Sequence, residues 1–258
     1  MMRFAVKVAY LGEHFSGSQA QPGLRTVEGD ILSDLQKILR IPADDIDLKI
    51  ASRTDRGVNS LGNVAVFGSS VDDQDILMRA LNAVSKDIFY RSIASVDDGF
   101  NPRFADERKY RYILPSDGMD TAAMKECAGM FAGEHDFMRF CKSECKPTVL
   151  TLNSVDIRRE NDIIVIDFSA KYYLWNMIRR IVAAIASVGR GDSEVSDARD
   201  ALDGKNVTFG LARPDALTLL DVFYKGVDFA VPSADMFDRR IGEWMFRDRL
   251  RSMFFASL

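Results

Sequence analysis

The chain has 258 residues, of which 47% are apolar and 28% are charged, and its formal net charge is −4. This composition is typical of a globular protein, and the length allows one large domain or two small ones. No stretch approaches the roughly 20 apolar residues of a membrane helix, and the first residues lack the apolar run of a secretory signal, so we expect a cytoplasmic protein.

The first hundred residues alternate between strand and helix patterns. Apolar side chains occur at every second position from Phe4 to Tyr10, which predicts a strand. Thr26 can cap a helix, and the apolar residues that follow it at helical spacing predict a helix up to Leu39. Similar patterns predict strands at 48–51 and 64–67, a helix at 74–84 and a strand at 88–94. The order of the first half is therefore βαββαβ.

The loop between the second and third predicted strands carries a conspicuous carboxylate. Asp55 is flanked by Arg53 and Arg56 in the segment ASRTDRGVNSLGNVAVF, and a glycine follows. Opposite charges on both sides favour the ionised form of a carboxylate. An ionised carboxylate in a shaped site can act as a nucleophile, whereas a lone aspartate between arginines is usually part of a salt bridge. The loop alone leaves both interpretations open.

The second half repeats the order of elements. Its patterns predict strands at 109–114, 149–158, 163–171 and 219–224, helices at 119–131 and 174–188, and a weaker helix at 195–202. Two helices for every four strands in this order are typical of the ferredoxin-like fold, which has an antiparallel sheet with helices on one face. We therefore predict an α+β protein with two ferredoxin-like subdomains, residues 1–105 and 106–258, whose antiparallel sheets join around a central cleft.

The helix predicted at 174–188 carries two arginines at the edge of its apolar stripe. Arg179 and Arg180 lie on different sides of the centre of that stripe. Either side chain could pair with a carboxylate from another element, while the other stays available for solvent or phosphate. Periodicity alone does not choose between them.

Two local basic stretches are compatible with nucleic-acid binding despite the negative net charge. The first spans 103–111, and the second is the tail from 239 to 251, which holds five arginines and two aromatic residues. For the tail alone, an amphipathic helix with a solvated charged face is the stronger interpretation.

A zinc site is the functional interpretation of His135, Cys141 and Cys145. Such a site needs a fourth ligand, and the only other histidine, His14, is far away in the sequence. The odd set of three cysteines, which Cys127 completes, also argues against a disulfide framework. We therefore predict free thiols and no metal.

Several segments resemble the tRNA pseudouridine synthase A family. RTDRGVNSLGNVAVF is similar to the signature of that family. Other matching segments follow the family's order, namely YLGEHFSGSQAQ, LNAVSKDI, FNPRFADERKYRYIL, GEHDFMRFC, NMIRRIVAAIASVGRG and ARPDALTLLDVFY. Matches in this order along nearly the whole chain argue strongly against an accidental resemblance.

The resemblance implies that the chain isomerises uridine to pseudouridine in the anticodon arm of tRNA, as a homodimer and without a cofactor or a metal. On the matched positions, Asp55 would be the nucleophile, Tyr110 the active-site tyrosine and Arg179 the basic partner of the aspartate. Attack at C1′, attack at C6 and assistance to a glycal route all remain open. The basic residues that would contact RNA are Arg53, Arg56, Arg103, Arg108, Lys109 and Arg180.

The chain also departs from the family pattern at a few positions. Ser18 and Ala20 stand where the family often has tryptophan and arginine, and Arg56 replaces a common alanine. Asn59 replaces a common histidine, and Ala216 replaces the usual glycine before the last strand. None of these changes affects the expected nucleophile, so they bear on the choice of substrate.

Two other functions are compatible with the residues. A non-catalytic RNA-binding protein built from ferredoxin-like units is one, although a binder gains nothing from an anion that faces phosphate. A hydrolase of nucleosides or sugars is the other, and it normally requires a second carboxylate. The loop of Asp55 holds none, and Asp136 or Asp106 would have to be supplied by folding.

Overall fold

The computed structural model describes residues 1–142, 147–232 and 238–257. The first half contains the predicted βαββαβ order, and the elements are β1 (Met2–Tyr10), α1 (Val27–Leu39), β2 (Lys49–Ile50), β3 (Asn59–Ser69), α2 (Gln74–Val84) and β4 (Ile88–Val96). Short 3₁₀ helices lie at η1 (Gly12–His14) and η2 (Ala43–Asp45). Thr26 caps α1 as predicted, because its hydroxyl accepts a hydrogen bond from the Gly29 amide.

The second half contains the other predicted strands and helices together with one short strand that the pattern did not reveal. The elements are β5 (Glu107–Pro115), α3 (Thr121–Gly129), β6 (Gly133–Asp136), η3 (Met138–Phe140), β7 (Val149–Glu160), β8 (Ile163–Ala170), α4 (Met177–Gly189), α5 (Val195–Leu202), β9 (Leu217–Phe223) and α6 (Asp238–Phe255). Helix α4 begins three residues later than predicted, because Asn176 adopts a left-handed conformation with φ 63°. Among the described residues, no helix is long and apolar enough to cross a membrane.

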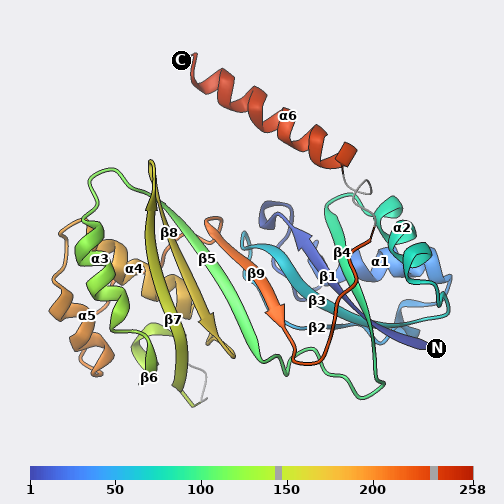
Figure 1. The fold of residues 1–258 in the computed structure, drawn as a ribbon, viewed down its shortest axis with the longest axis horizontal. Coiled ribbons are helices and arrows are strands. Elements are labelled where there is room, and N and C mark those ends of the chain that lie inside the picture. Colours follow the sequence, from blue (N-terminus) through green and yellow to red (C-terminus); the bar gives the residue numbers. More distant parts are fainter. Residues whose placement is uncertain (143–146, 233–237, 258) are drawn as a thin grey trace.

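One mixed sheet runs through both halves of the α+β fold (Figure 1). Its strand order is β4-β1-β3-β9-β5-β8-β7-β6, and β2 pairs with β3. The pairing of β3 with β9 is parallel, through Asn59 with Thr218 and Ser60 with Leu219, whereas the other pairings between strands are antiparallel. The pairings within each half are antiparallel, but the prediction of purely antiparallel sheets is corrected at the junction, where the halves are joined by a parallel pair and the sheet becomes mixed.

The junction between the halves leaves no room for a side chain at Gly62. A Cβ there would lie 2.7 Å from the Leu220 carbonyl oxygen and 2.8 Å from Asp221 Oδ1. These distances are shorter than van der Waals contact, so the close approach of β3 to β9 requires glycine.

Two apolar clusters form the core, and one of them crosses the junction. Phe4 and Phe67 face α1 and α2 in the first cluster. Ala5, Val64 and Val66, from the same two strands, belong to the second cluster, which includes the apolar faces of α3 and α4. Successive residues of a strand point to opposite faces, so both faces of β1 and β3 are covered. The halves are therefore joined by packing as well as by the sheet.

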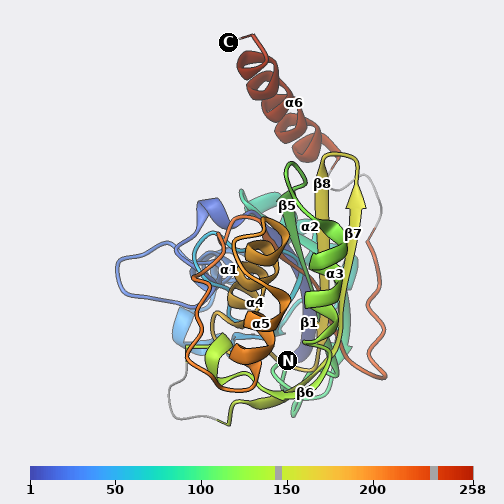
Figure 2. The same ribbon diagram turned by 90° about the vertical axis from the view of Figure 1, so that its left-hand side faces the viewer.

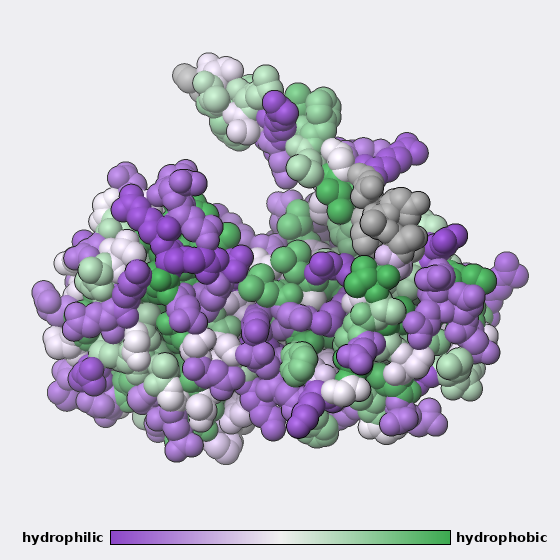
Figure 3. Space-filling view, viewed as in Figure 1, coloured by the Kyte–Doolittle hydropathy of each residue, from purple (hydrophilic) through white to green (hydrophobic). Residues whose placement is uncertain are grey.

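Helix α6 stands away from the rest of the molecule in two perpendicular views (Figures 1 and 2). Near its start, Arg240 donates to the Ser85 carbonyl oxygen at 2.8 Å and lies over the Phe89 ring. Trp244 packs edge-on against Phe89 and His14. Exposed apolar side chains continue along the helix (Figure 3), at Met245, Phe246, Leu250, Met253, Phe254 and Phe255.

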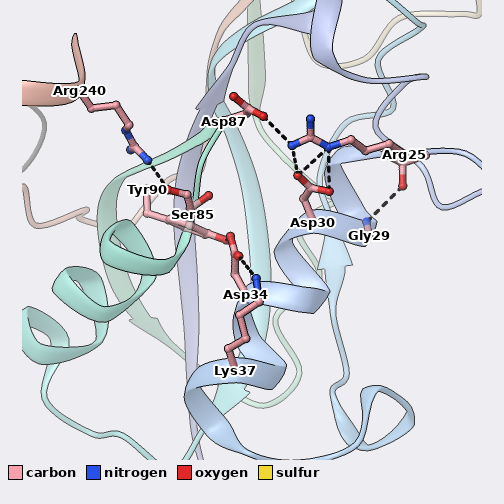
Figure 4. Close-up of polar contacts among 10 residues, drawn as sticks. Arg25, Gly29, Asp30, Asp34, Lys37, Ser85, Asp87, Tyr90 and Arg240 are labelled. Atoms are coloured by element: carbon pink, nitrogen blue, oxygen red, sulfur yellow. Dashed lines mark hydrogen bonds and ion pairs between the residues drawn. The ribbon is translucent and has the colours of Figure 1, made fainter. Parts of the chain in front are cut away.

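The surface beneath the start of α6 is held by ion pairs (Figure 4). Arg25 donates to Asp30 on α1 and to Asp87 before β4, both at 2.6 Å. The neighbouring Asp34 is buried and accepts from the Tyr90 hydroxyl at 3.1 Å and from Lys37 at 3.3 Å. The three aspartates of this surface are therefore paired within the first half.

Candidate active site

Asp55 lies where the two halves of the chain meet. Its Oδ2 accepts a hydrogen bond from Arg179 Nη1 at 3.1 Å, and its Oδ1 accepts one from Trp175 Nε1 at 3.1 Å. The Asp55 side chain is 33% exposed, so it is accessible while both of its oxygens are held. The partners come from residues at the start of α4, more than a hundred positions later in the chain.

Arg179 is the arginine of α4 that faces the aspartate, which settles the choice that periodicity left open. Its side chain is 13% exposed. Its Nε donates to the Ala212 carbonyl oxygen at 2.8 Å, and Nη1 also reaches Asn176 Oδ1 at 3.4 Å. A guanidinium tied to neighbours in this way presents a fixed donor to a carboxylate. Arg53 and Arg56, next to Asp55 in the sequence, are exposed.

Buried polar contacts fix the loop that carries Asp55. The Thr54 amide donates to Ser18 Oγ at 2.8 Å, and the Ser18 amide donates to the Thr54 carbonyl oxygen at 3.0 Å. The hydroxyls of Thr54 and Tyr10 lie 2.9 Å apart. Ser18 is 1% exposed. The serine that departs from the family pattern is therefore a support of the loop.

A second departure, Asn59, ties the other end of the loop to two segments. Its Oδ1 accepts from the Gly12 amide at 2.8 Å, and its Nδ2 donates to the Asp215 carbonyl oxygen at 2.8 Å. Gly12 packs so closely that an added Cβ would lie 2.3 Å from the Gly57 carbonyl carbon.

The change Gly12→Ala is expected to lower the free energy of unfolding by about 1–3 kcal/mol, because the backbone of the loop must move to admit a methyl group. Thermal or urea unfolding would measure this change. Gly99→Ala is the matched control, since a Cβ at Gly99 meets nothing within 4 Å. Equal effects of the two substitutions would show that the close packing at Gly12 does not contribute to the free energy of unfolding.

Tyr110 lies on β5 beside the Asp55 loop. It is 7% exposed, and its ring meets the edge of Tyr173 with centroids 5.2 Å apart. Burial raises the pKa of the Tyr110 hydroxyl, and the negative charge of Asp55 acts in the same direction, while a hydrogen bond with Ser52 opposes them. The phenol therefore stays protonated at neutral pH and can donate a proton.

Arg108 is placed differently from the phosphate contact that the sequence suggested. It is 7% exposed, and its guanidinium donates to Ser52 Oγ at 3.0 Å and to the carbonyl oxygens of Ala51, Arg103 and Lys171. The side chain thus joins β5 to the residues just before Asp55. This buried position does not fit an RNA contact, because the donors of the guanidinium are used within the protein.

The other basic candidates are exposed or half-buried. Arg103 and Lys109 are exposed, and Lys109 pairs with Glu107 at 3.5 Å. Arg180 is half-buried, and its Nε is buried without a hydrogen-bond partner among the described residues. Burial of the Cys141 thiol raises its pKa, and the positive charge of Arg180 opposes this shift in part.

Within residues 1–142, 147–232 and 238–257, no three His, Cys, Asp or Glu side chains are grouped so that they could hold a metal ion. Cys127 and Cys141 are free and buried. The third cysteine, Cys145, lies outside the described residues.

Trp175 is the site residue that reasoning from the sequence missed. One signal could have found it, because it is one of only two tryptophans and lies four residues before Arg179. Trp175 lies in the turn before α4, and this turn brings its indole to the same carboxylate as Arg179.

Comparisons with known proteins show the family to which this chain is similar. A family model described as tRNA pseudouridine synthase matches residues 127–225. A protein of Pyrococcus abyssi named tRNA pseudouridine synthase A is 37% identical over 96% of this chain and 95% of its own length. Proteins of the same name from Thermococcus kodakarensis and Archaeoglobus fulgidus are 40% and 36% identical, over 88% and 90% of this chain and 87% of each relative.

A solved archaeal box H/ACA sRNP Nop10–Cbf5 complex aligns with 71% of this chain and 44% of that chain, at 12% identity and a TM-score of 0.34. This similarity is too low to support an argument about function.

Proposed function

Because this chain belongs to the tRNA pseudouridine synthase A family, we propose that it isomerises uridine to pseudouridine in tRNA, with Asp55 as the nucleophile. The observation that carries the assignment of Asp55 is its ion pair with Arg179 at 3.1 Å. The pair joins the two halves of the chain at an accessible carboxylate, and a guanidinium holds that carboxylate in a fixed orientation.

The proposed reaction moves one bond of the uridine. The bond between N1 of uracil and C1′ of ribose breaks, the base turns, and a new bond forms between C5 and C1′. The proton on C5 is lost to solvent, and N1 gains a proton. Asp55 attacks C1′ or C6, or assists the expulsion of uracil as a glycal forms, and the site must hold the free base and exclude water meanwhile.

Tyr110 supplies a buried ring and a protonated hydroxyl beside Asp55. The ring can stack on uracil, and the hydroxyl can deliver or accept a proton as the base turns. Its burial among aromatic side chains supports this role, because it keeps the phenol neutral at the working pH.

The exposed basic residues are the proposed contacts with the tRNA backbone. Arg53, Arg56, Arg103 and Lys109 lie on the surface of the segments that border the Asp55 loop. Flipping the target uridine out of its stack costs a few kcal/mol, which contacts to phosphate and base offset. We place the target uridine in the anticodon arm and the active species as a homodimer, and half-buried Arg180 remains a secondary candidate.

We further propose that residues 1–105 and 106–258 are two ferredoxin-like units. The strand orders β4-β1-β3-β2 and β9-β5-β8-β7 are equivalent, and the pairings within each are antiparallel. On this division, Asp55 comes from the first unit and Arg179 from the second.

The test uses unmodified tRNA transcripts tritiated at uridine C5. We expect the protein to release tritium into water and to leave pseudouridine in the tRNA, and mapping of the product would give the position. Release of free uracil would favour a hydrolase instead. Tight binding of tRNA with no tritium release would favour a non-catalytic RNA-binding protein.

A further inference from the structure

Both oxygens of Asp55 are occupied in the structure, but their partners differ in kind. Oδ2 is held by the charged Arg179 and Oδ1 by the neutral indole N–H of Trp175, each at 3.1 Å. Each oxygen keeps a second lone pair, but a hydrogen bond draws electron density from the oxygen that accepts it and makes that oxygen a weaker nucleophile. The two partners, Arg179 and Trp175, differ in how easily each can move away from Asp55.

The side chain of Arg179 is held in place by its contacts with the protein. Its Nε is committed to the Ala212 carbonyl oxygen, and its side chain is 13% exposed. Moving it would leave a charge without its partner at a partly buried site, which is costly.

The side chain of Trp175 is exposed and is held less firmly than that of Arg179. Its side chain is 47% exposed, and its ring is covered in part by the ammonium of Lys142, whose Nζ lies 4.1 Å from the ring centroid. Lys142 is itself exposed. A cation over an exposed ring is held weakly, and a phosphate of incoming RNA can draw that cation away.

A half-exposed indole beside a nucleophile is also a surface on which a nucleobase can stack. Every base has a π-face, and stacking on an aromatic side chain is a common means by which proteins hold unstacked bases. The ring that covers Oδ1 in the free protein is therefore chemically suited to contact the RNA that approaches it.

We propose that Trp175 is a gate on the nucleophile, which holds Asp55 Oδ1 in the free protein and moves onto a base of the RNA as the target uridine enters. This inference depends on the proposed function, because it assigns the gate to that same site. Movement of the indole frees Oδ1 for reaction, and Arg179 keeps Oδ2 in place. Asp55 thus becomes reactive only when RNA occupies the site.

The chain holds two tryptophans, so each can be observed alone. In the variant Trp244→Phe, only Trp175 fluoresces, and we expect its emission to fall when unmodified tRNA is added. In Trp175→Phe, the remaining Trp244 should change much less. Unchanged emission of Trp175, with tRNA bound in a filter assay, would overturn the proposal.

The kinetics of tritium release distinguish two roles of Trp175, a gate that moves onto the RNA and a support that holds Asp55 during the reaction. Trp175→Ala removes the stacking surface, and we expect the KM for tRNA to rise roughly 5- to 150-fold. Trp175→Phe keeps a ring but removes the N–H, so its KM for tRNA should rise less than that of Trp175→Ala. An equal loss of kcat in both variants would show that the N–H supports the reaction, and would also overturn the gate.

These outcomes stay separate from failure of the proposed function. If the wild-type protein releases no tritium, the assigned reaction is wrong whatever Trp175 does. If the wild type releases tritium while the emission of Trp175 is insensitive to tRNA, the reaction stands and the gate is wrong.

Discussion

Replacement of Asp55 by asparagine is expected to lower the rate of pseudouridine formation by at least about 10⁴-fold, as removal of a nucleophile does in other enzymes. The asparagine keeps the shape of the side chain and one acceptor oxygen, so only one of the donors Trp175 and Arg179 keeps its hydrogen bond, and its amide cannot act as the nucleophile. Tritium release under single-turnover conditions would measure the rate. Binding of tRNA and the melting temperature are expected to change little.

Asp200→Asn is the matched control for this change. Asp200 is also a carboxylate in an ion pair, with Lys205 at 2.8 Å, but it lies on α5. We expect its activity to equal that of the wild type. The introduced asparagine can deamidate back to aspartate, so Asp55→Ala serves as a second variant in which this cannot happen. Activity of Asp55→Ala within tenfold of the wild type would show that Asp55 is not the nucleophile.

Replacement of Arg108 by methionine is expected to lower the free energy of unfolding by about 3 kcal/mol or more. The carbonyl oxygens of Ala51, Arg103 and Lys171 then lose the hydrogen bonds that the buried Arg108 guanidinium donates to them. Urea unfolding at neutral pH would measure the loss. Because the contacts lie just before Asp55, the variant should also lose activity at temperatures where it remains folded.

Lys109→Met is the control, since this neighbouring residue is exposed and its pair with Glu107 is at the surface. Exposed pairs contribute about 0–1 kcal/mol, so its stability should barely change. The two residues also differ in their expected effect on tRNA binding. Loss of one phosphate contact reduces the slope of log affinity against log salt concentration by about one. We expect this reduction for Lys109→Met and not for Arg108→Met. The opposite result would contradict the buried position of Arg108.

The sequence predicted most elements because their apolar residues repeat at the period of a strand or a helix. It did not predict the β3–β9 junction, since Asn59 and Ser60 pair with residues near 218 and no local pattern encodes a partner so distant. Strand β6 was missed because GEHD has no apolar alternation.

The site was predicted in part, and the reasons differ among its residues. Asp55 and Arg179 were brought together by the family resemblance, because periodicity could not choose between Arg179 and Arg180. Arg108 was misjudged from its basic neighbours, although it shares a strand face with Tyr110 and would be inward by alternation. Trp175 was missed because its role depends on where the chain turns before α4.

The parallel pairing of β3 with β9 has a consequence for the time at which the protein becomes active in the cell. The ribosome finishes β3 about 150 residues before it makes β9, so the strand beside the Asp55 loop waits for its partner while those residues are synthesised. Long-range pairing of this kind folds late. A growing chain therefore holds its aspartate without the β3–β9 junction that joins the two halves of the site until β9 has been made.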